Sequence, residues 1–274
     1  MTEYELIKAA LAEDLAGGVD ITSHATIAAD ATATADFVAR ANGVIAGINI
    51  AHAVLSEVGL SDIALLKKDG DRVNAGDVLI TVSGNTRAIL LAERTALNFF
   101  GHLSGIATLT SKWVAEVSGT KCQVRDTRKT TPGMRNLEKY AVRMGGGTNH
   151  RLNLSDAALI KDNHISAAGG VTSAFNQVRA AYPSAEIEIE VDTLAQLKEV
   201  LLQNPDLILL DNMTPEQCAE AVAITSGRCK LEASGGISIA NASAYAKSGV
   251  DYIAIGALTH SAPVFDIGLD LRAE

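Results

Sequence analysis

The sequence of 274 residues contains little cysteine, proline or aromatic residue. Its three cysteines, Cys122, Cys218 and Cys229, form no Cys-x-x-Cys motif and cannot all pair with one another. This pattern predicts a reducing, cytoplasmic environment, with the cysteines as buried packing residues rather than nucleophiles. Five prolines exclude a proline-rich linker, and an aromatic content of 4% is too low for a platform that stacks nucleic-acid bases.

Long apolar runs are also absent. No stretch of about 18 apolar residues occurs, so we expect no membrane span. The first 14 residues carry four acids and one lysine, whereas signal peptides and mitochondrial presequences begin with basic residues. The formal net charge of −9 disfavours a general nucleic-acid binder and a membrane-surface protein. We therefore expect neither nucleic acid nor membrane as a partner.

The chain is rich in apolar residues and carries its positive charge in one segment. A hydrophobic fraction of 47% and 23 glycines are typical of a tightly packed α/β protein. Residues 121–161 hold nine Lys or Arg against three Asp or Glu. One interpretation is a solvated basic surface. The other is a basic cleft within an acidic body, which attracts a small, highly anionic substrate.

Residues 1–105 predict an N-terminal open α/β sandwich. Thr2 and Glu5 have the spacing of a capping box at the start of a helix. The strand-like runs that follow are 33–41, 44–48, 63–67 and 78–82. The stretch 69–79 resembles the small β-hammerhead of lipoyl and biotinyl carriers but lacks their Met-Lys pair. We therefore expect a hammerhead-like structural domain rather than a swinging-arm carrier.

A long helix is expected from about residue 86 to residue 117. Apolar residues recur in it at helical spacing, at Ile89, Ala92, Ala96, Phe99, Leu103 and Ile106. Arg94 lies two residues from Ala92, about 200° around the helix, and so points away from this stripe. From spacing alone, Arg94 is as consistent with a surface ion pair as with a functional residue.

Residues 106–263 predict an incomplete, six-stranded α/β barrel. The β-rich runs alternate with helices and span 122–127, 157–161, 187–191, 207–211, 230–233 and 252–255. Glu190, Asp211 and Glu232 are each 21 residues apart, which marks the repeat. Six units are too few for a complete eight-fold barrel. The tail, residues 264–274, is expected to pack on the N-terminal domain.

Charged residues or glycines follow each of the six predicted strands. Active sites of such barrels lie at the carboxyl ends of the strands. The six ends carry 126–130, 161–164, Glu190 with Asp192, Asp211 with Asn212, 234–236, and 256–257. A single acid at a strand end is typical of a helix cap, but six consecutive ends of this kind predict an active site.

The chemistry of these residues divides into three groups. The loops Ser234-Gly235-Gly236 and Ile255-Gly256-Ala257 are typical of phosphate cradles on the last two strands. Arg128, Arg151 and Lys161 predict a cage for a compact dianion, and a glycine-rich loop at 145–147 presents His150 beside them. Glu190 and Asp211 can hold Mg²⁺ with water and substrate oxygens, or hydrogen-bond a ribose diol. The sequence leaves these two roles open.

These motifs, in order along essentially the whole chain, resemble the quinolinate phosphoribosyltransferase family. The resemblance is carried by 93–98, 126–130, 145–151, 159–164, 190–192, 210–212 and 234–237. It implies a two-domain type II phosphoribosyltransferase, with an open α/β sandwich and an incomplete barrel. It also implies a homodimer, in some members a higher oligomer, whose subunits share active sites. The implied reaction converts quinolinate and phosphoribosyl pyrophosphate, with Mg²⁺, to nicotinate mononucleotide, CO₂ and pyrophosphate in NAD biosynthesis.

The resemblance also implies roles for individual residues. The residues implied to form the quinolinate cage are Arg128, His150, Arg151 and Lys161. Arg94 is implied to come from the partner subunit. Thr127 and Lys129 lie in the substrate loop, with Lys129 at the phosphates. Glu190 and Asp211 are implied to lie near the ribose and to hold Mg²⁺, directly or through water. Together with Lys129 they form the implied catalytic set. The 5′-phosphate site is implied at Ser234, Gly235, Gly236, Ile255, Gly256 and Ala257.

Three alternatives remain at this stage. The first is a paralogue of this family associated with molybdenum transport, with the same fold and a different base or acceptor; the cage cations disfavour it. The second is a nonenzymatic carrier or interaction module built on the hammerhead, which leaves the six polar strand ends unexplained. The third is an aldolase-type barrel in which Lys161 forms a Schiff base, although its cationic neighbours fit a dianion equally well.

Overall fold

The chain folds into two compact units. The structure is a computed structural model that describes residues 2–272. The N-terminal unit comprises the residues up to Ser111, together with Thr131–Gly146 and those from Ser261 on. The barrel unit comprises Lys112–Thr130 and Gly147–His260. The boundary expected near residue 105 therefore falls inside one helix, α4 (Thr86–Glu116).

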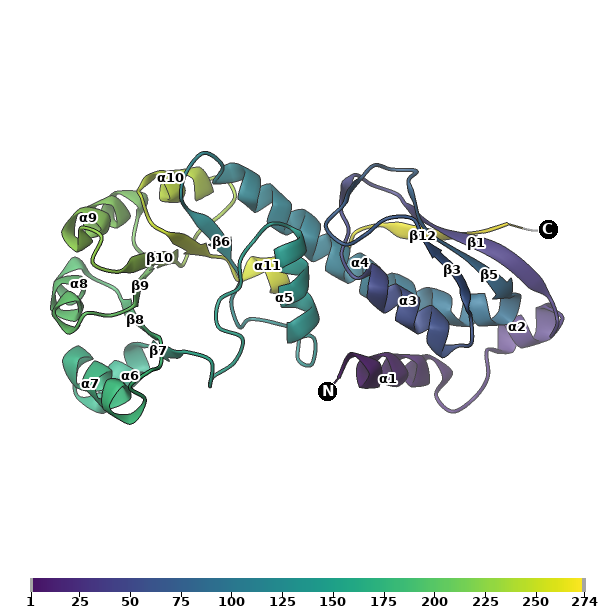
Figure 1. The fold of residues 1–274 in the computed structure, drawn as a ribbon, viewed down its shortest axis with the longest axis horizontal. Coiled ribbons are helices and arrows are strands. Elements are labelled where there is room, and N and C mark those ends of the chain that lie inside the picture. The colour runs from purple at the N-terminus through teal and green to yellow at the C-terminus, as the bar shows by residue number, and fades with distance from the viewer. Residues whose placement is uncertain (1, 273–274) are drawn as a thin grey trace. The chain divides into compact units, whose positions relative to one another are not determined.

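The N-terminal unit contains a four-stranded antiparallel sheet in the order β12-β1-β5-β3 (Figure 1). Its strands are β1 (Thr32–Ala39), β3 (Asp62–Leu65), β5 (Val78–Asn85) and β12 (Ile267–Arg272). A separate pair joins β2 (Gly43–Val44) to β4 (Arg72–Val73). The C-terminal tail supplies β12, which pairs antiparallel with β1. Residues 273 and 274 of the predicted tail lie outside the described residues.

The helices of this unit are α1 (Glu3–Leu15), α2 (Ile21–Thr26), α3 (Ile48–Glu57), most of α4, and α5 (Arg135–Met144). The predicted capping box of α1 is confirmed. The amide of Glu5 donates to Thr2 Oγ1 over 3.2 Å, and the amide of Thr2 donates to Glu5 Oε2 over 2.7 Å. No helix among the described residues combines the length and apolar character needed to cross a membrane.

The predicted strand at 44–48 is wrong beyond Val44. The chain turns at Gly47, whose φ of 94° lies in the left-handed region, and α3 begins at Ile48. Short apolar runs do not distinguish a buried helix from a strand. The buried residues of α3 include Ala51 and Leu55, four apart as a helix requires.

The apolar stripe predicted for α4 is confirmed. All six of its residues are buried, with exposures between 0 and 7%, whereas Arg94 is exposed.

Residues 131–146 group with the N-terminal unit, although the sequence places them in the barrel domain. The phenol of Tyr140 donates to Asp69 Oδ2 over 2.7 Å, and His102 Nε2 lies 2.9 Å from the buried Glu138 Oε1. Gly145 packs so closely on α4 that a Cβ there would meet the Ala107 carbonyl oxygen at 2.4 Å. Tertiary contacts of this kind leave no local trace in the sequence.

The barrel unit is built on six parallel strands in the order β6-β11-β10-β9-β8-β7. The six predicted strands are confirmed as β6 (Gln123–Arg125), β7 (Ala158–Ile160), β8 (Ile187–Val191), β9 (Leu207–Asp211), β10 (Lys230–Ser234) and β11 (Tyr252–Ala254). Since β6 and β7 form the two edges of this sheet, the barrel stays incomplete.

Helices alternate with these strands. They are α6 (Asp162–Ala168), α7 (Val171–Ala181), α8 (Leu194–Val200), α9 (Pro215–Thr225), α10 (Ala242–Lys247) and α11 (Ala257–His260). A short 3₁₀ turn, Leu201–Gln203, follows α8. Figure 1 shows α7, α8, α9 and α10 along the outer side of the curved sheet.

Strand alternation decides which side chains enter the barrel. On β8, Ile187, Ile189 and Val191 are almost fully buried, and Glu188 and Glu190 point to the opposite face. The same alternation places Glu232 on the interior face of β10. Polar side chains therefore share the barrel interior, below and at the carboxyl ends of the strands.

Candidate active site

A cavity of about 430 Å³ opens at the carboxyl ends of the barrel strands. We call it the cation-lined cavity. It brings together nine of the predicted site residues: Thr127, Arg128, Lys129, His150, Arg151, Lys161, Glu190, Asp211 and Ser234. Leu159, Leu209, Glu232 and Ala254 also line it.

A second cavity, of about 400 Å³, adjoins the first. We call it the glycine-lined cavity, because Gly235, Gly236 and Gly256 line it together with Ile255 and Ala257. Thr127, Lys129, Asp211, Ser234 and Ala254 line both cavities. A ligand that extends across this boundary would therefore contact both sets of side chains.

The glycine loops require glycine at Gly235 and are tightly packed at Gly256. Gly235 has a φ of +83°, and a Cβ there would meet Asn212 Oδ1 at 2.1 Å. A Cβ at Gly256 would lie 3.0 Å from Lys129 Cδ, so the lysine side chain passes directly over this loop. Loops of this kind let backbone N–H groups approach a phosphate closely.

The loop after β6 is fixed by Asp126, which is fully buried. Asp126 accepts hydrogen bonds from the backbone amide of His150, over 2.9 Å, and from the Asn149 side chain. At the other end of the loop, the Lys129 carbonyl accepts from Thr259 Oγ1 over 2.7 Å. The segments that carry Arg128, Lys129 and His150 are thereby held in fixed relative positions.

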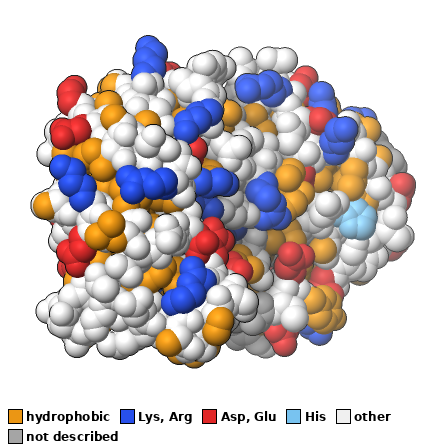
Figure 2. Space-filling model, turned by 60° about the vertical axis from the view of Figure 1, so that its left-hand side comes forward, with side chains coloured by type: hydrophobic (Ala, Val, Ile, Leu, Met, Phe, Trp, Pro, Cys, Tyr) orange, Lys and Arg blue, Asp and Glu red, His pale blue; other side chains and the backbone are white. Residues whose placement is uncertain are grey.

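The cavity holds its arginines close together. Burial, and then the neighbouring Arg128 guanidinium, lower the pKa of Arg151. Arg151 Nη1 donates to the Ala157 carbonyl over 2.9 Å. The Nε atoms of Arg128 and Arg151 are buried and have no hydrogen-bond partner among the described residues. Figure 2 shows lysine and arginine side chains gathered on the face that it turns forward. Guanidinium groups with unused donors suit a carboxylate ligand.

Two carboxylates stand on neighbouring strands at the cavity. Glu190 Oε2 lies 2.8 Å from Lys161 Nζ, and Asp211 Oδ2 accepts from Asn212 Nδ2 over 2.6 Å. An ion-paired ammonium is a poor nucleophile, so this arrangement does not favour a Schiff base at Lys161. Carboxylate oxygens are donors that fit Mg²⁺.

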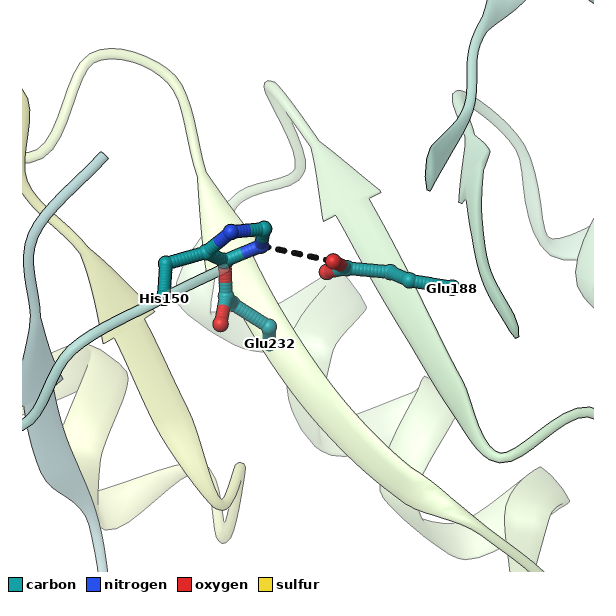
Figure 3. Close-up of side chains that lie close together, drawn as sticks. All are labelled: His150, Glu188 and Glu232. Carbon is teal, nitrogen blue, oxygen red and sulfur yellow. Dashed lines mark hydrogen bonds and ion pairs between the residues drawn. The ribbon is translucent and has the colours of Figure 1, made fainter. Parts of the chain in front are cut away.

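Three charged residues at or next to the cavity are absent from the predicted site: Arg125, Glu188 and Glu232. Glu232 lines the cavity, and the other two contact residues that line it. Figure 3 shows the His150 ring between the two glutamates. His150 Nε2 lies 2.6 Å from Glu188 Oε2 and 3.6 Å from Glu232 Oε1. Glu232 Oε2 in turn accepts from Arg125 Nη1 over 2.8 Å.

The sequence contains a signal for these acids. In the run Ile187-Glu188-Ile189-Glu190-Val191, glutamates alternate with β-branched residues on a buried strand, so both glutamates face the barrel interior. Glu232 is recognisable in the sequence only through the 21-residue repeat. Burial raises the pKa of Glu188 and Glu232 to about 7.

Arg94 and the cysteines lie elsewhere. Arg94 is exposed on α4 in the N-terminal unit and is not among the residues that line either cavity. Burial raises the pKa of Cys122 and Cys218 to about 12 and that of the half-buried Cys229 to about 11. Thiols with such pKa values are not nucleophiles at neutral pH.

Models of known protein families match most of the sequence. Residues 20–104 match the model of the N-terminal domain of quinolinate phosphoribosyl transferase, and residues 106–270 match that of the C-terminal domain. The chain belongs to the quinolinate phosphoribosyltransferase family. The fold expected from that family, an open sandwich with an incomplete barrel, is therefore confirmed.

Individual members of the quinolinate phosphoribosyltransferase family are closely similar to this chain. The nicotinate-nucleotide pyrophosphorylase [carboxylating] of Mycobacterium leprae is 52% identical, over 97% of this chain and 96% of that protein. A probable enzyme of the same name from Bacillus subtilis is 41% identical, over 94% and 90%. The crystal structure of the Ehrlichia chaffeensis nicotinate-nucleotide pyrophosphorylase superposes with a TM-score of 0.94 at 41% identity, covering 99% of both chains.

The raised pKa of Glu232 predicts a pH-dependent contribution to stability. Burial, and then the Glu188 carboxylate, raise this pKa from the ordinary 4.5 to about 7. Between these values the folded state binds more protons than the unfolded state, so the free energy of unfolding falls as pH rises. Relative to Glu232→Gln, the wild type should therefore lose stability from about pH 4.5 to about pH 7.

Urea denaturation of both proteins across this range measures the difference. Glu186→Gln, at an exposed position of the same segment, serves as the control for the loss of a surface carboxylate. A wild-type advantage that stays constant or grows with pH would contradict the burial of an ionisable Glu232.

Proposed function

We propose that this chain transfers the phosphoribosyl group of phosphoribosyl pyrophosphate to quinolinate, with loss of CO₂. The products are nicotinate mononucleotide and pyrophosphate, and the reaction belongs to NAD biosynthesis. The observation that carries this proposal is that the cation-lined cavity directly adjoins the glycine-lined cavity. A dicarboxylate and a phosphorylated sugar therefore have contiguous sites in a family that performs this transfer.

Quinolinate occupies the cation-lined cavity. Arg128 and Arg151 offer guanidinium donors to its two carboxylates, and Lys161 adds a third positive charge. His150, fixed through its backbone amide by Asp126, completes this cage. Binding between fixed cations sets the ring nitrogen of quinolinate toward the ribose.

Phosphoribosyl pyrophosphate occupies the glycine-lined cavity and its boundary. Backbone N–H groups of residues 234–236 and 255–257 hold the 5′-phosphate. Lys129, which crosses Gly256, lies where it can offset charge on the departing pyrophosphate. Asp211 at the shared boundary and Glu190 in the cation-lined cavity face the ribose.

Transfer and decarboxylation follow one another. The ring nitrogen forms a bond to the anomeric carbon as the bond from that carbon to pyrophosphate breaks. Positive charge develops on the ribose, and the Glu190 and Asp211 carboxylates stabilise it. The ribosylated nitrogen is cationic, so the ring accepts the electron pair left when the adjacent carboxylate departs as CO₂. That ring carbon then takes up a proton.

Glu190 and Asp211 would also hold Mg²⁺, directly or through water. When bound, the ion supplies positive charge to the pyrophosphate oxygens.

We also propose that the chain acts as a homodimer with shared active sites, which can assemble further. Arg94 is exposed and lies away from the buried stripe of α4. In the dimer, Arg94 of the partner subunit completes the quinolinate cage. The cytoplasmic location stays a prediction, supported by free cysteines at 122, 218 and 229.

The first test is turnover of quinolinate. Purified protein with quinolinate, phosphoribosyl pyrophosphate and Mg²⁺ should consume quinolinate and release nicotinate mononucleotide, CO₂ and pyrophosphate in equal amounts. Nicotinate in place of quinolinate should give no product. A protein that is silent with quinolinate but folded would instead point to a paralogue that uses another acceptor.

Arg128→Ala should separate the two substrates. Losing a charge-assisted pair to a carboxylate should raise the KM for quinolinate by about 10- to 100-fold, with little change in the KM for phosphoribosyl pyrophosphate. Steady-state kinetics measures both constants. Lys198→Ala, at an exposed position on α8, is the control and should match the wild type. Equal effects on both constants would remove Arg128 from the quinolinate cage.

Complementation tests the shared active site. Arg94→Ala and Arg128→Ala proteins should each be nearly inactive with quinolinate at subsaturating concentration. Mixed dimers contain one site with both arginines intact, so refolding an equal mixture should restore about a quarter of wild-type activity. A mixture that remains as inactive as its components would place Arg94 in its own subunit's site or outside the site.

A further inference from the structure

The charged cluster under the cation-lined cavity has no role in the steps above. Glu188 is 3% exposed and does not line the cavity, whereas His150, which it contacts, does. The two side chains meet through His150 Nε2 and Glu188 Oε2, 2.6 Å apart (Figure 3). Glu188 can therefore affect a ligand only through another residue.

We propose that Glu188 is a positioning residue for the pyridine dicarboxylate and acts through His150. The proposal rests on the proposed function, because it assigns His150 to the wall of the quinolinate site. Glu188 accepts a hydrogen bond from Nε2–H of the imidazole and so fixes both the ring orientation and the nitrogen that carries the proton. A carboxylate behind a functional histidine commonly has this effect.

Two of the contacts that hold His150 act on different parts of the residue, and one of them comes from Glu188. Its backbone amide donates to Asp126 Oδ1 over 2.9 Å, a bond that fixes the main chain but by itself allows the ring to rotate. The short contact from Nε2 to a buried carboxylate removes that freedom. A ring that is fixed before the substrate arrives loses no further rotational entropy when it binds.

Glu232 cannot replace Glu188 as the direct partner. Its Oε2 is already paired with Arg125 Nη1, and the Arg125 guanidinium stacks 4.1 Å from the Tyr252 ring centre. Its Oε1 lies 3.6 Å from His150 Nε2, beyond hydrogen-bond distance. Two carboxylates facing one nitrogen nevertheless favour a proton on that nitrogen.

The same three residues are of types that bind metal ions, and one ligand atom from each lies within 4.8 Å of the others. The contacts argue against that use. Glu232 is neutralised by Arg125, whose positive charge would repel a cation beside it. The arrangement instead fits a row of charged groups that runs from Arg125 through Glu232 to the imidazole of His150.

The effect of Glu188 should fall on one substrate. His150 lines the cation-lined cavity but is not among the residues found around the glycine-lined cavity, and neither is Glu188. A change at Glu188 should therefore weaken quinolinate binding and leave the binding of phosphoribosyl pyrophosphate almost unchanged. A general loss of packing in the barrel would weaken both.

Two substitutions at this position separate hydrogen bonding from volume. Glu188→Leu keeps a similar volume and cannot accept a hydrogen bond, and Glu188→Gln retains an acceptor oxygen. We expect E188L to raise the KM for quinolinate about 10- to 100-fold and E188Q to recover part of that loss. The KM for phosphoribosyl pyrophosphate should change less than about twofold in both. The exposed Glu186→Gln is the matched control and should behave as the wild type.

The outcomes separate the inference from the function beneath it. If the wild type is active and E188L is folded, an unchanged KM for quinolinate in E188L would overturn the inference alone. Equal increases in the KM values for both substrates would do the same. Wild type that does not convert quinolinate at all would overturn both the proposed function and the inference.

A measurement on the wild type covers the case in which E188L does not fold. Nitrogen-15 NMR of the histidine side chains, with His150 assigned by its loss in His150→Asn, reports which ring nitrogen carries a proton. The proposal predicts a proton on Nε2 of His150. A spectrum in which that nitrogen is unprotonated would overturn it.

Discussion

Repulsion among cations is the constraint on which the active site depends. Arg128, Arg151 and Lys161 line one cavity, and Arg125 lies just below it. Such a group is stable only if anions are built in among the cations, and the barrel supplies them from its interior: Glu190 pairs with Lys161, and Glu232 pairs with Arg125. The Nε atoms of Arg128 and Arg151 have no hydrogen-bond partner among the described residues, so positive charge at the cavity is only partly compensated.

Strand alternation lets one sheet build both the core and the site. On β8 the isoleucines and valine pack into the core while Glu188 and Glu190 face the barrel interior. The deeper acid contacts a histidine and the shallower acid reaches the cavity, so two residues one pleat apart serve different purposes. The glycine loops after β10 and β11 add the glycine-lined cavity at the same edge. The two cavities adjoin because side chains such as Lys129, Asp211 and Ser234 line both of them.

Much of this could be predicted from the sequence, because its signals are local. Six strands, the long helix with its buried stripe, and nine residues of the cation-lined cavity all follow from spacing and from the position of polar residues after each strand. The helix at Ile48–Glu57 was not predictable by the same means, since a short apolar run fits either structure. The grouping of residues 131–146 with the N-terminal unit and the pairing of His150 with Glu188 depend on contacts between distant segments. Composition and spacing do not encode such contacts.

The claim at the centre of this account is that the cation-lined cavity recognises a pyridine with two adjacent carboxylates. Isothermal titration calorimetry of the wild-type protein with quinolinate, and separately with nicotinate, tests it most directly, because the ligands differ by one carboxylate. Losing one charge-assisted contact should make nicotinate bind at least about tenfold more weakly than quinolinate. Equal affinity for the two ligands, or binding of nicotinate alone, would contradict the account.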